Sequence, residues 1–160
     1  MTAQGEIDEL LFRLSDVPLR IARAVEGYNE TELHAAHAEG QWSATDILAH
    51  IRASDAIVAY RAYVLLIRDN PALQAYDERL WAEIALYAQV NFRASLALYA
   101  LQRAELVNML RHTNLESWQR IGLHEVKGPV SLLDVVTSLV EHEEEHCAQL
   151  EALRSTRLSS

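Results

Sequence analysis

At 160 residues, half of them hydrophobic, the chain is long enough to bury a core and too apolar to be intrinsically disordered. Its formal net charge of -9 gives a surface that repels phosphate groups, which argues against nucleic acid and anionic membranes as partners. Five Gly and three Pro are too few turn signals for an all-β fold and favour a few long helices.

The sequence shows no sign of export. Its first residues are polar and acidic, whereas a signal peptide begins with basic and then apolar residues. No stretch approaches the ~20 apolar residues that span a bilayer. The single cysteine, Cys147, has no partner for an internal disulfide, which fits a reducing compartment. We therefore expect a cytoplasmic protein with one domain over residues 1–160.

Periodicity and helix-start signals predict four helical regions. The first runs from about Glu6 to Glu26, and Pro18, preceded by a serine and an aspartate, predicts a kink or a restart within it. The third covers about 77–112 and is predicted to break near Asn91, a residue type that caps a following helix.

The second and fourth helices begin at residue pairs that have the spacing of a capping box. Ser43 with Asp46 begins the second helix, and Ser131 with Asp134 begins the fourth. In both pairs, aspartate replaces the usual glutamate or glutamine. The same local signal therefore predicts where two of the four helices start.

The helix ends and the connections complete the predicted fold. The second helix should end before Pro71, and the fourth at about Arg154. Residues 113–130 are expected to form a long loop that is either functional or a packed cover. The predicted fold is an all-α four-helix bundle with long connections between the helices.

Histidines supply the clearest chemical signal. His142 and His146 lie four residues apart on the fourth helix, where both imidazoles reach one ion. At about 100° per residue, His146 falls inside the apolar stripe, His142 at its edge and Glu143 also inside. A buried carboxylate there requires a compensating charge, which a metal would supply. His50, near the apolar stripe of the second helix, completes the set of three that open metal sites use.

Two sharper metal motifs compete for these residues. The run from His142 to His146 matches the zincin pattern, in which Glu143 would be the general base of a metalloprotease. Only 14 residues follow His146, however, which leaves little chain for a third ligand downstream. A di-iron carboxylate bundle needs two Glu-x-x-His motifs, and this chain has one. Cys147 has no clear basic partner and is expected to pack rather than to act as a nucleophile.

Three short motifs follow one another along most of the chain. They are Gly40-Gln41-Trp42-Ser43 with Ile47-Leu48-Ala49-His50, then Trp118-Gln119-Arg120 with Gly122, His124 and Gly128, and finally Glu141-His142-Glu143 with His146 and Gln149. In this order and spacing they resemble the DinB/YfiT-like superfamily of metal-binding four-helix bundles, from roughly Pro18 to Leu153. Each motif alone is short and degenerate, so the resemblance depends on their combination.

The resemblance implies that His50, His142 and His146 bind one divalent ion, nickel or zinc, and that the protein forms a homodimer. Glu143 stands where many relatives carry Asp, and the longer carboxylate could reach the ion or reposition a bound water. Relatives include transferases and isomerases that use low-molecular-weight thiols, and others assigned as metal-dependent hydrolases. The resemblance therefore implies a class of activity without selecting a member.

The favoured function is a metal-dependent enzyme of the thiol-dependent S-transferase type. It would use a low-molecular-weight thiol as cosubstrate and a small molecule as electrophile. Glu143 is the candidate for proton transfer, and Gln149 for orienting a ligand. Three alternatives stay open: a metal-dependent hydrolase, a non-catalytic metal- or ligand-binding protein of the stress response, and a bundle whose histidines pack without a metal.

Other polar and aromatic residues allow two interpretations each. His124 either lines the mouth of a pocket or has a structural role. Arg61 and Arg103 fall on or near helix stripes, where they either pair with carboxylates or bind an anionic substrate. Trp42 and Trp118 are expected to anchor the core or a loop rather than to bind substrate.

Overall fold

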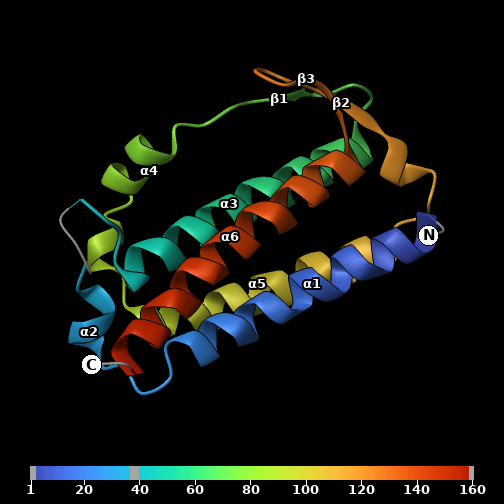
Figure 1. Ribbon diagram of the computed structural model, residues 1–160. Coiled ribbons are helices and arrows are strands. Elements are labelled where there is room, and N and C mark those ends of the chain that lie inside the picture. The colour runs from blue at the N-terminus through green and yellow to red at the C-terminus, as the bar shows by residue number, and fades with distance from the viewer. Residues whose placement is uncertain (1–2, 37–39, 159–160) are drawn as a thin grey trace.

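Four long helices form the body of the protein (Figure 1). The structure is a computed structural model that describes residues 3–36 and 40–158. The helices are α1 (Ala3–Ala24), α3 (Ala44–Ile67), α5 (Phe92–Arg111) and α6 (Leu132–Leu158). This arrangement confirms the predicted all-α four-helix bundle. Among the residues described, no helix is apolar over a sufficient length to cross a membrane.

The helices pack in an order that differs from a simple up-and-down bundle. Helices α1 and α3 each lie against both α5 and α6. Arg13 of α1 forms an ion pair with Glu144 of α6. Arg20 pairs with Glu151 at the same separation of 131 residues. Because the partners advance together along both helices, α1 and α6 run parallel, whereas α3 and α6 run antiparallel (Figure 1).

Helix α1 continues through Pro18 without the predicted restart. Because proline has no N–H, the carbonyl group of Leu14 cannot receive its usual helical hydrogen bond. Arg103 of α5 supplies the missing donor, with its Nη1 atom 3.0 Å from the Leu14 oxygen. The irregularity in α1 is therefore a point at which another helix is attached.

Hydrogen bonds at the caps confirm the predicted helix starts. The Ser43 side chain accepts a hydrogen bond from the N–H of Asp46, and the Asp46 carboxylate accepts one from the N–H of Ser43. Ser131 and Asp134 make the same exchange before α6. Asn91 caps α5 through its side-chain oxygen, so the break predicted in the third region is also confirmed.

The connection from α3 to α5 returns along the length of the bundle, because these two helices run in the same direction (Figure 1). It contains a two-residue strand, a short helix and a turn of 3-10 helix, which are β1 (Ala72–Leu73), α4 (Glu78–Ile84) and η1 (Tyr87–Gln89). The predicted helix over 77–112 is therefore two helices separated by η1. The connection from α1 to α3 carries the short α2 (Glu30–His34).

Residues 113–130 contain strands that the sequence did not predict. The 3-10 turn η2 (Ser117–Gln119) leads into β2 (Ile121–His124). Strand β2 pairs antiparallel with β3 (Gly128–Ser131) and parallel with β1, which gives a three-stranded sheet in the order β1-β2-β3. This sheet lies across one end of α3 and α6 (Figure 1). The segment is therefore an ordered cover rather than a loop.

Strand β2 is held tightly against α3. A Cβ atom added to Gly122 would lie 2.9 Å from a methyl carbon of Leu65 and 3.0 Å from one of Leu73, so only glycine fits without a shift. Arg120, just before the strand, donates from Nε to the carbonyl oxygen of Leu65 at 2.5 Å and from Nη2 to that of Arg68 at 2.7 Å. These contacts fix the position of the sheet over the helices.

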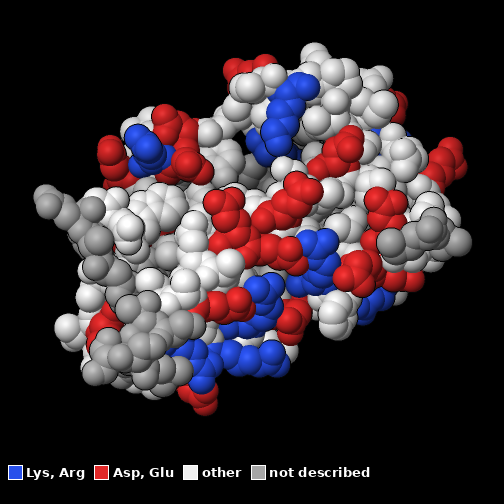
Figure 2. All heavy atoms as spheres, in the orientation of Figure 1, with Lys and Arg blue, Asp and Glu red and all other residues white. Residues whose placement is uncertain are grey.

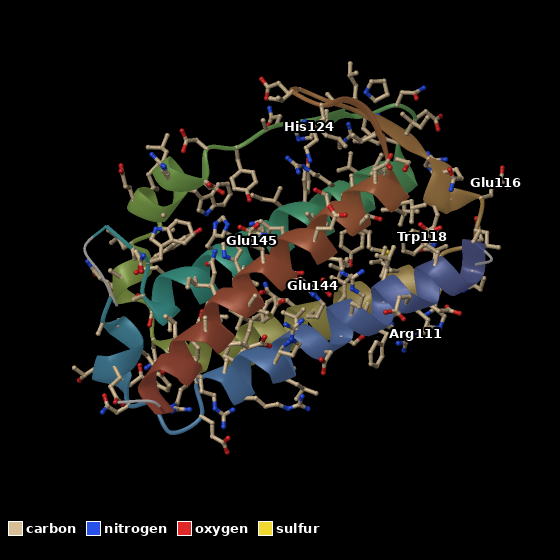
Figure 3. All side chains as sticks on the ribbon, viewed as in Figure 1. Arg111, Glu116, Trp118, His124, Glu144 and Glu145 are labelled. Carbon is tan, nitrogen blue, oxygen red and sulfur yellow. The ribbon has the colours of Figure 1, made fainter. Side chains whose placement is uncertain are left out.

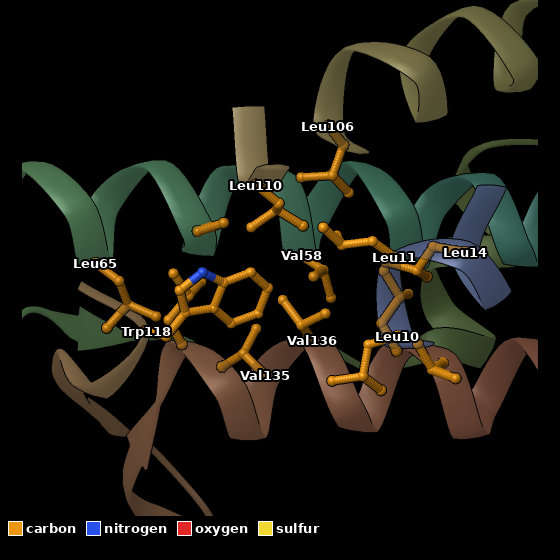
Figure 4. Close-up of a cluster of buried hydrophobic side chains, with 14 of the residues drawn as sticks. Leu10, Leu11, Leu14, Val58, Leu65, Leu106, Leu110, Trp118, Val135 and Val136 are labelled. Atoms are coloured by element: carbon orange, nitrogen blue, oxygen red, sulfur yellow. The ribbon is translucent and has the colours of Figure 1, made fainter. Parts of the chain in front are cut away.

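The core consists of two apolar clusters, and all four long helices contribute to both. The first surrounds Trp118, which is 1% exposed and packs among leucines and valines (Figure 4). The second contains Phe92 and Tyr99 of α5, together with Cys147. The expectation that Trp118 anchors the core is confirmed.

Candidate metal centre

Three histidines converge between α3 and α6. His50 lies on the second turn of α3, and His142 and His146 lie on successive turns of α6. The Nε2 atom of His142 is 2.8 Å from that of His50 and 3.2 Å from that of His146. Ligand nitrogens on a tetrahedral zinc ion lie roughly 3.3 Å apart. The residues predicted as ligands are therefore close enough to share one ion, although metal binding itself stays a prediction.

Two of these histidines are held in the neutral state. Burial, together with the nearby imidazoles of His142 and His146, lowers the pKa of His50 to about 4. Burial and the adjacent His146 lower the pKa of His142 to about 4 as well. A neutral imidazole keeps the lone pair that a metal ligand needs. The chemistry of this donor set therefore fits a divalent ion.

Side chains around the histidines orient their rings. Gln149 Oε1 lies 3.0 Å from His146 Nδ1 and accepts its hydrogen bond, which leaves the lone pair of His146 on Nε2. The ring centroid of Trp42 lies 4.8 Å from that of His50 and 6.4 Å from that of His146. Gln149 thus makes the contact expected of a residue that orients a ligand, and Trp42 packs beside the ligand atoms.

The side chain of Glu143 points towards α5 rather than towards α3, the helix that carries His50. Its carboxylate is fully buried and accepts hydrogen bonds from Arg103 at 2.7 and 2.5 Å and from the Tyr99 hydroxyl at 3.0 Å. Arg103 also donates to Asp55 at 2.6 and 3.0 Å. The compensating charge that we expected from a metal is therefore supplied by Arg103. The carboxylate of Glu143 therefore belongs to this buried network. Its predicted role in proton transfer stays a prediction.

The buried network keeps Arg103 charged. Burial opposes the charge, but Glu143, Tyr99 and Asp55 raise the pKa of Arg103 well above its usual range. Of the two roles open to this residue, pairing with carboxylates is the one that the structure shows. A charged side chain taken out of water is tolerated here because two carboxylates face it.

A carboxylate that the sequence did not single out lies beside the histidines. Glu78 begins α4, which Asp77 caps by accepting hydrogen bonds from two backbone N–H groups. The Oε2 atom of Glu78 lies 3.6 Å from His50 Nε2, and the side chain is 56% exposed. The spacing in the sequence gives no signal for this contact, because α4 is short and reaches His50 only through the returning connection.

Two cavities reach the histidines. One has a volume of about 300 Å³, lies beneath the sheet and extends to His142. His124, at the end of β2, lines it as one interpretation predicted (Figure 3). Its Nδ1 atom also accepts hydrogen bonds from the N–H groups of Val126 and Lys127 at 3.2 Å, which is the structural role that the other interpretation predicted. The other has a volume of about 900 Å³, and Trp42, Glu78 and His146 contribute to its lining. Small molecules therefore have space beside His142 in one cavity and beside His146 in the other.

The remaining polar residues of this part of α6 have structural roles. Glu144 is half-buried and pairs with Arg13 of α1, and Glu145 is exposed (Figure 3). Cys147 is buried, and burial raises the pKa of its thiol to about 12. A thiol that stays protonated is a poor nucleophile, so packing is the role that its surroundings support.

These features define a class of four-helix bundles with a three-histidine site between two antiparallel helices. The model of the DinB superfamily matches residues 13–150, and the chain belongs to this superfamily. A protein of Oceanobacillus iheyensis, provisionally named a metal-dependent hydrolase, is 24% identical over 157 residues, which cover 97% of this chain and 89% of that protein. YfiT of Bacillus subtilis, named in the same way, is 24% identical over 147 residues, or 91% of this chain and 83% of YfiT.

Two solved structures share the fold. The structure of Bacillus subtilis YfiT, described as having an unusual four-helix bundle topology, superposes with a TM-score of 0.87 at 23% identity. That match covers 99% of this chain and 90% of YfiT. A mycothiol-dependent maleylpyruvate isomerase superposes with a TM-score of 0.72 at 18% identity, over 90% of this chain and 60% of the isomerase. At these identities the comparison establishes the fold alone.

Proposed function

We propose that the protein is a divalent-metal-dependent enzyme that acts on a small molecule, with His50, His142 and His146 as the ligands of one nickel or zinc ion. The convergence of three Nε2 atoms carries this proposal. A bound ion supplies Lewis acidity, which lowers the pKa of a thiol or a water molecule placed beside it. Three protein ligands leave coordination positions open, as catalytic sites require.

We favour a thiol-dependent S-transferase because two separate cavities reach the histidines. A reaction between two molecules needs both to be held beside the same reactive centre. The thiol would lose its proton, its sulfur electron pair would form a bond to an electrophilic carbon, and the proton would pass to the departing group. Glu78 is an exposed carboxylate 3.6 Å from His50 Nε2, and we propose that it carries the proton, because Glu143 is held by Arg103 and Tyr99 in the buried network.

A metal-dependent hydrolase is the second candidate. The same Glu78 carboxylate, 3.6 Å from His50 Nε2, would accept a proton from water instead of from a thiol. The provisional names of the Bacillus and Oceanobacillus relatives also favour hydrolysis. In this candidate only one of the two cavities needs to hold an organic substrate.

Metal content tests the site itself. The wild type and a His50→Ala variant would be purified identically, without chelator or added metal, and measured by plasma mass spectrometry. We expect near-stoichiometric nickel or zinc in the wild type and loss of the metal in the variant. His112→Ala, which removes an exposed histidine from the end of α5, is the matched control and should keep the metal. A metal-free wild type that also fails to bind added nickel or zinc would overturn the proposal.

Turnover separates the candidate reactions. The metal-loaded protein would be given cysteine or 2-mercaptoethanol with a chloronitroaromatic electrophile, and separately a 4-nitrophenyl ester. Conjugation without ester cleavage supports the transferase, and the reverse supports the hydrolase. A fully loaded protein that turns over neither panel supports a non-catalytic binding protein. The homodimer and the cytoplasmic location stay predictions, the first of which light scattering would check.

A further inference from the structure

Arg61 of α3 is a half-buried cation that no carboxylate neutralises within the part of the chain that the structure describes. Its Nη2 atom donates to the carbonyl oxygen of Gln74 at 2.5 Å, and it forms no ion pair. Burial lowers its pKa, which shows that its charge is incompletely compensated. Arg103, by contrast, faces both Asp55 and Glu143. Desolvated charges are normally paired, so Arg61 lacks a partner of the kind that Arg103 has.

Arg61 faces the 300 Å³ cavity together with Lys127, whose Nζ atom donates to the Ser138 hydroxyl at 3.3 Å. The imidazole of His124 also lines the cavity, and its Nδ1 atom accepts hydrogen bonds from the N–H groups of Val126 and Lys127. Burial lowers the pKa of His124, and the charges of Arg61 and Lys127 on the same cavity lower it further, which favours the neutral imidazole. Figure 2 shows basic side chains beside the hollow beneath the strands. The hydroxyl groups of Tyr76 and Ser54, 2.9 Å apart, add neutral hydrogen-bonding capacity to the same cavity.

Asp134 and Glu125, two carboxylates near this cavity, accept hydrogen bonds from other groups. Asp134 lines the cavity, but its Oδ2 atom accepts hydrogen bonds from the N–H and the hydroxyl of Ser131 at 2.8 and 2.6 Å. Glu125 accepts a hydrogen bond from the N–H of Ala75 at 3.0 Å. Among the described residues, neither carboxylate forms an ion pair with Arg61, so its guanidinium group can still pair with a bound anion.

The other walls of the cavity are apolar and set the size of the ligand. They are formed by four aliphatic side chains, Val58, Val130, Val135 and Leu139. A volume of 300 Å³ accommodates on the order of ten non-hydrogen atoms, judged by the share of liquid volume that a water molecule takes. A ligand with one anionic end and a short hydrocarbon body matches these walls better than a polyhydroxylated one.

We infer that this cavity binds the carboxylate end of a small, largely apolar organic acid, with Arg61 as the anion-binding residue. A guanidinium group binds a carboxylate through two parallel hydrogen bonds, which fixes the orientation of the acid. The opposite end of the acid then lies towards His142, where the cavity meets the histidines. The orientation towards a reactive centre rests on the proposed function, whereas the binding of the carboxylate does not.

Binding of phenylacetate to the whole chain, measured by titration calorimetry, tests the inference. We expect phenylacetate to bind. The neutral phenylacetamide, which has the same shape, should bind with an affinity at least about tenfold lower. Arg61→Gln should weaken phenylacetate binding about tenfold or more. Arg68→Gln removes an exposed arginine that follows the last residue of α3 and does not line the cavity, so it should leave the affinity unchanged. Equal affinity for acid and amide, or an Arg61→Gln variant that binds like the wild type, would overturn the inference.

The His50→Ala variant separates this site from the metal. A carboxylate that binds directly to an ion at the histidines would be lost in His50→Ala and kept in Arg61→Gln, and that result also overturns the inference. A carboxylate held by Arg61 should bind to His50→Ala with nearly the wild-type affinity. If the protein binds no metal but still binds phenylacetate, the proposed function fails and the inference about the carboxylate site holds. Absence of saturable phenylacetate binding to the wild type counts against the cavity as a site for such acids.

Discussion

Arg103 joins all four long helices through one side chain. It belongs to α5 and donates hydrogen bonds to Leu14 of α1, Asp55 of α3 and Glu143 of α6. Each partner is buried, so each would be costly to leave without a hydrogen bond. Glu143 follows His142 directly in the sequence of α6. The network therefore links the packing of the bundle to the position of the candidate ligands.

Replacement of Arg103 by methionine should strongly destabilise the protein. The change leaves Glu143 and Asp55 buried without a counter-charge, and breaking one partner of a buried pair costs about 3–5 kcal/mol. Arg13→Met is the matched control, because the pair between Arg13 and Glu144 is partly exposed and contributes about 1 kcal/mol or less. Urea unfolding of the wild type and of the two variants gives the loss in free energy of unfolding that each substitution causes. Equal losses in the two variants would contradict the role given to burial.

The sequence predicted the positions of several site residues better than their partners. The inward direction of Glu143 followed from the helical period, which depends on neighbours along one helix. Its pairing with Arg103 joins residues on α5 and α6, and nothing local to either helix indicates it. Glu78 was missed for the same reason. The three histidines were an exception, because His142 and His146 share one helix and the motif around His50 added the third.

At the scale of the elements, helix starts were predictable and strands were not. Ser43 and Asn91 act through hydrogen bonds to residues three positions away, so the signal is contained in a few neighbouring letters. Strand β2 has four residues, and its parallel partner β1 lies about 50 residues earlier in the chain. Such short strands carry little alternation of their own. Their pairing depends on the packing of α3 and α6, because β1 follows α3 and β3 precedes α6 in the chain.

Gly122→Ala tests how tightly the sheet is held on the helices. The new methyl group would meet side chains of Leu65 and Leu73 and the Pro71 carbonyl oxygen at 2.9 to 3.0 Å, and overpacking of this kind costs about 1–3 kcal/mol. Leu123→Ala, next to it on the exposed side of β2, is the control and should change the stability by about 0.5 kcal/mol or less. Thermal unfolding would measure both. An unchanged midpoint in Gly122→Ala would show that the sheet moves freely on α3.

At the scale of the whole molecule, the candidate metal centre ties α3 to α6. His50 and His142 come from helices that are separated in sequence by the connection, α5 and the sheet. A ligand that binds only the folded state stabilises it by mass action. Metal binding should therefore raise the stability of the whole bundle, and not only of the residues around the ion.

Metal addition should raise the unfolding temperature of the apo-protein by several degrees. At a free metal concentration a hundredfold above the dissociation constant, the stabilisation is about 2.7 kcal/mol. Calorimetric scans with and without nickel or zinc would show the shift, and excess chelator should reverse it. The shift should vanish in His50→Ala and persist in His112→Ala. A shift of the same size in both variants would place the ion elsewhere.

The parallel contact between α1 and α6 has a consequence for the order of events during synthesis. Helix α1 leaves the ribosome long before α6, against which it packs through ion pairs that join residues 131 positions apart. Until α6 has emerged, the buried face of α1 lacks one of its two neighbouring helices, and two of the three histidines do not yet exist. Contacts of such long range slow folding and leave apolar surface open to other chains. We therefore expect the apolar face of α1 to stay partly exposed until α6 has been synthesised, and the three histidines to come together only then.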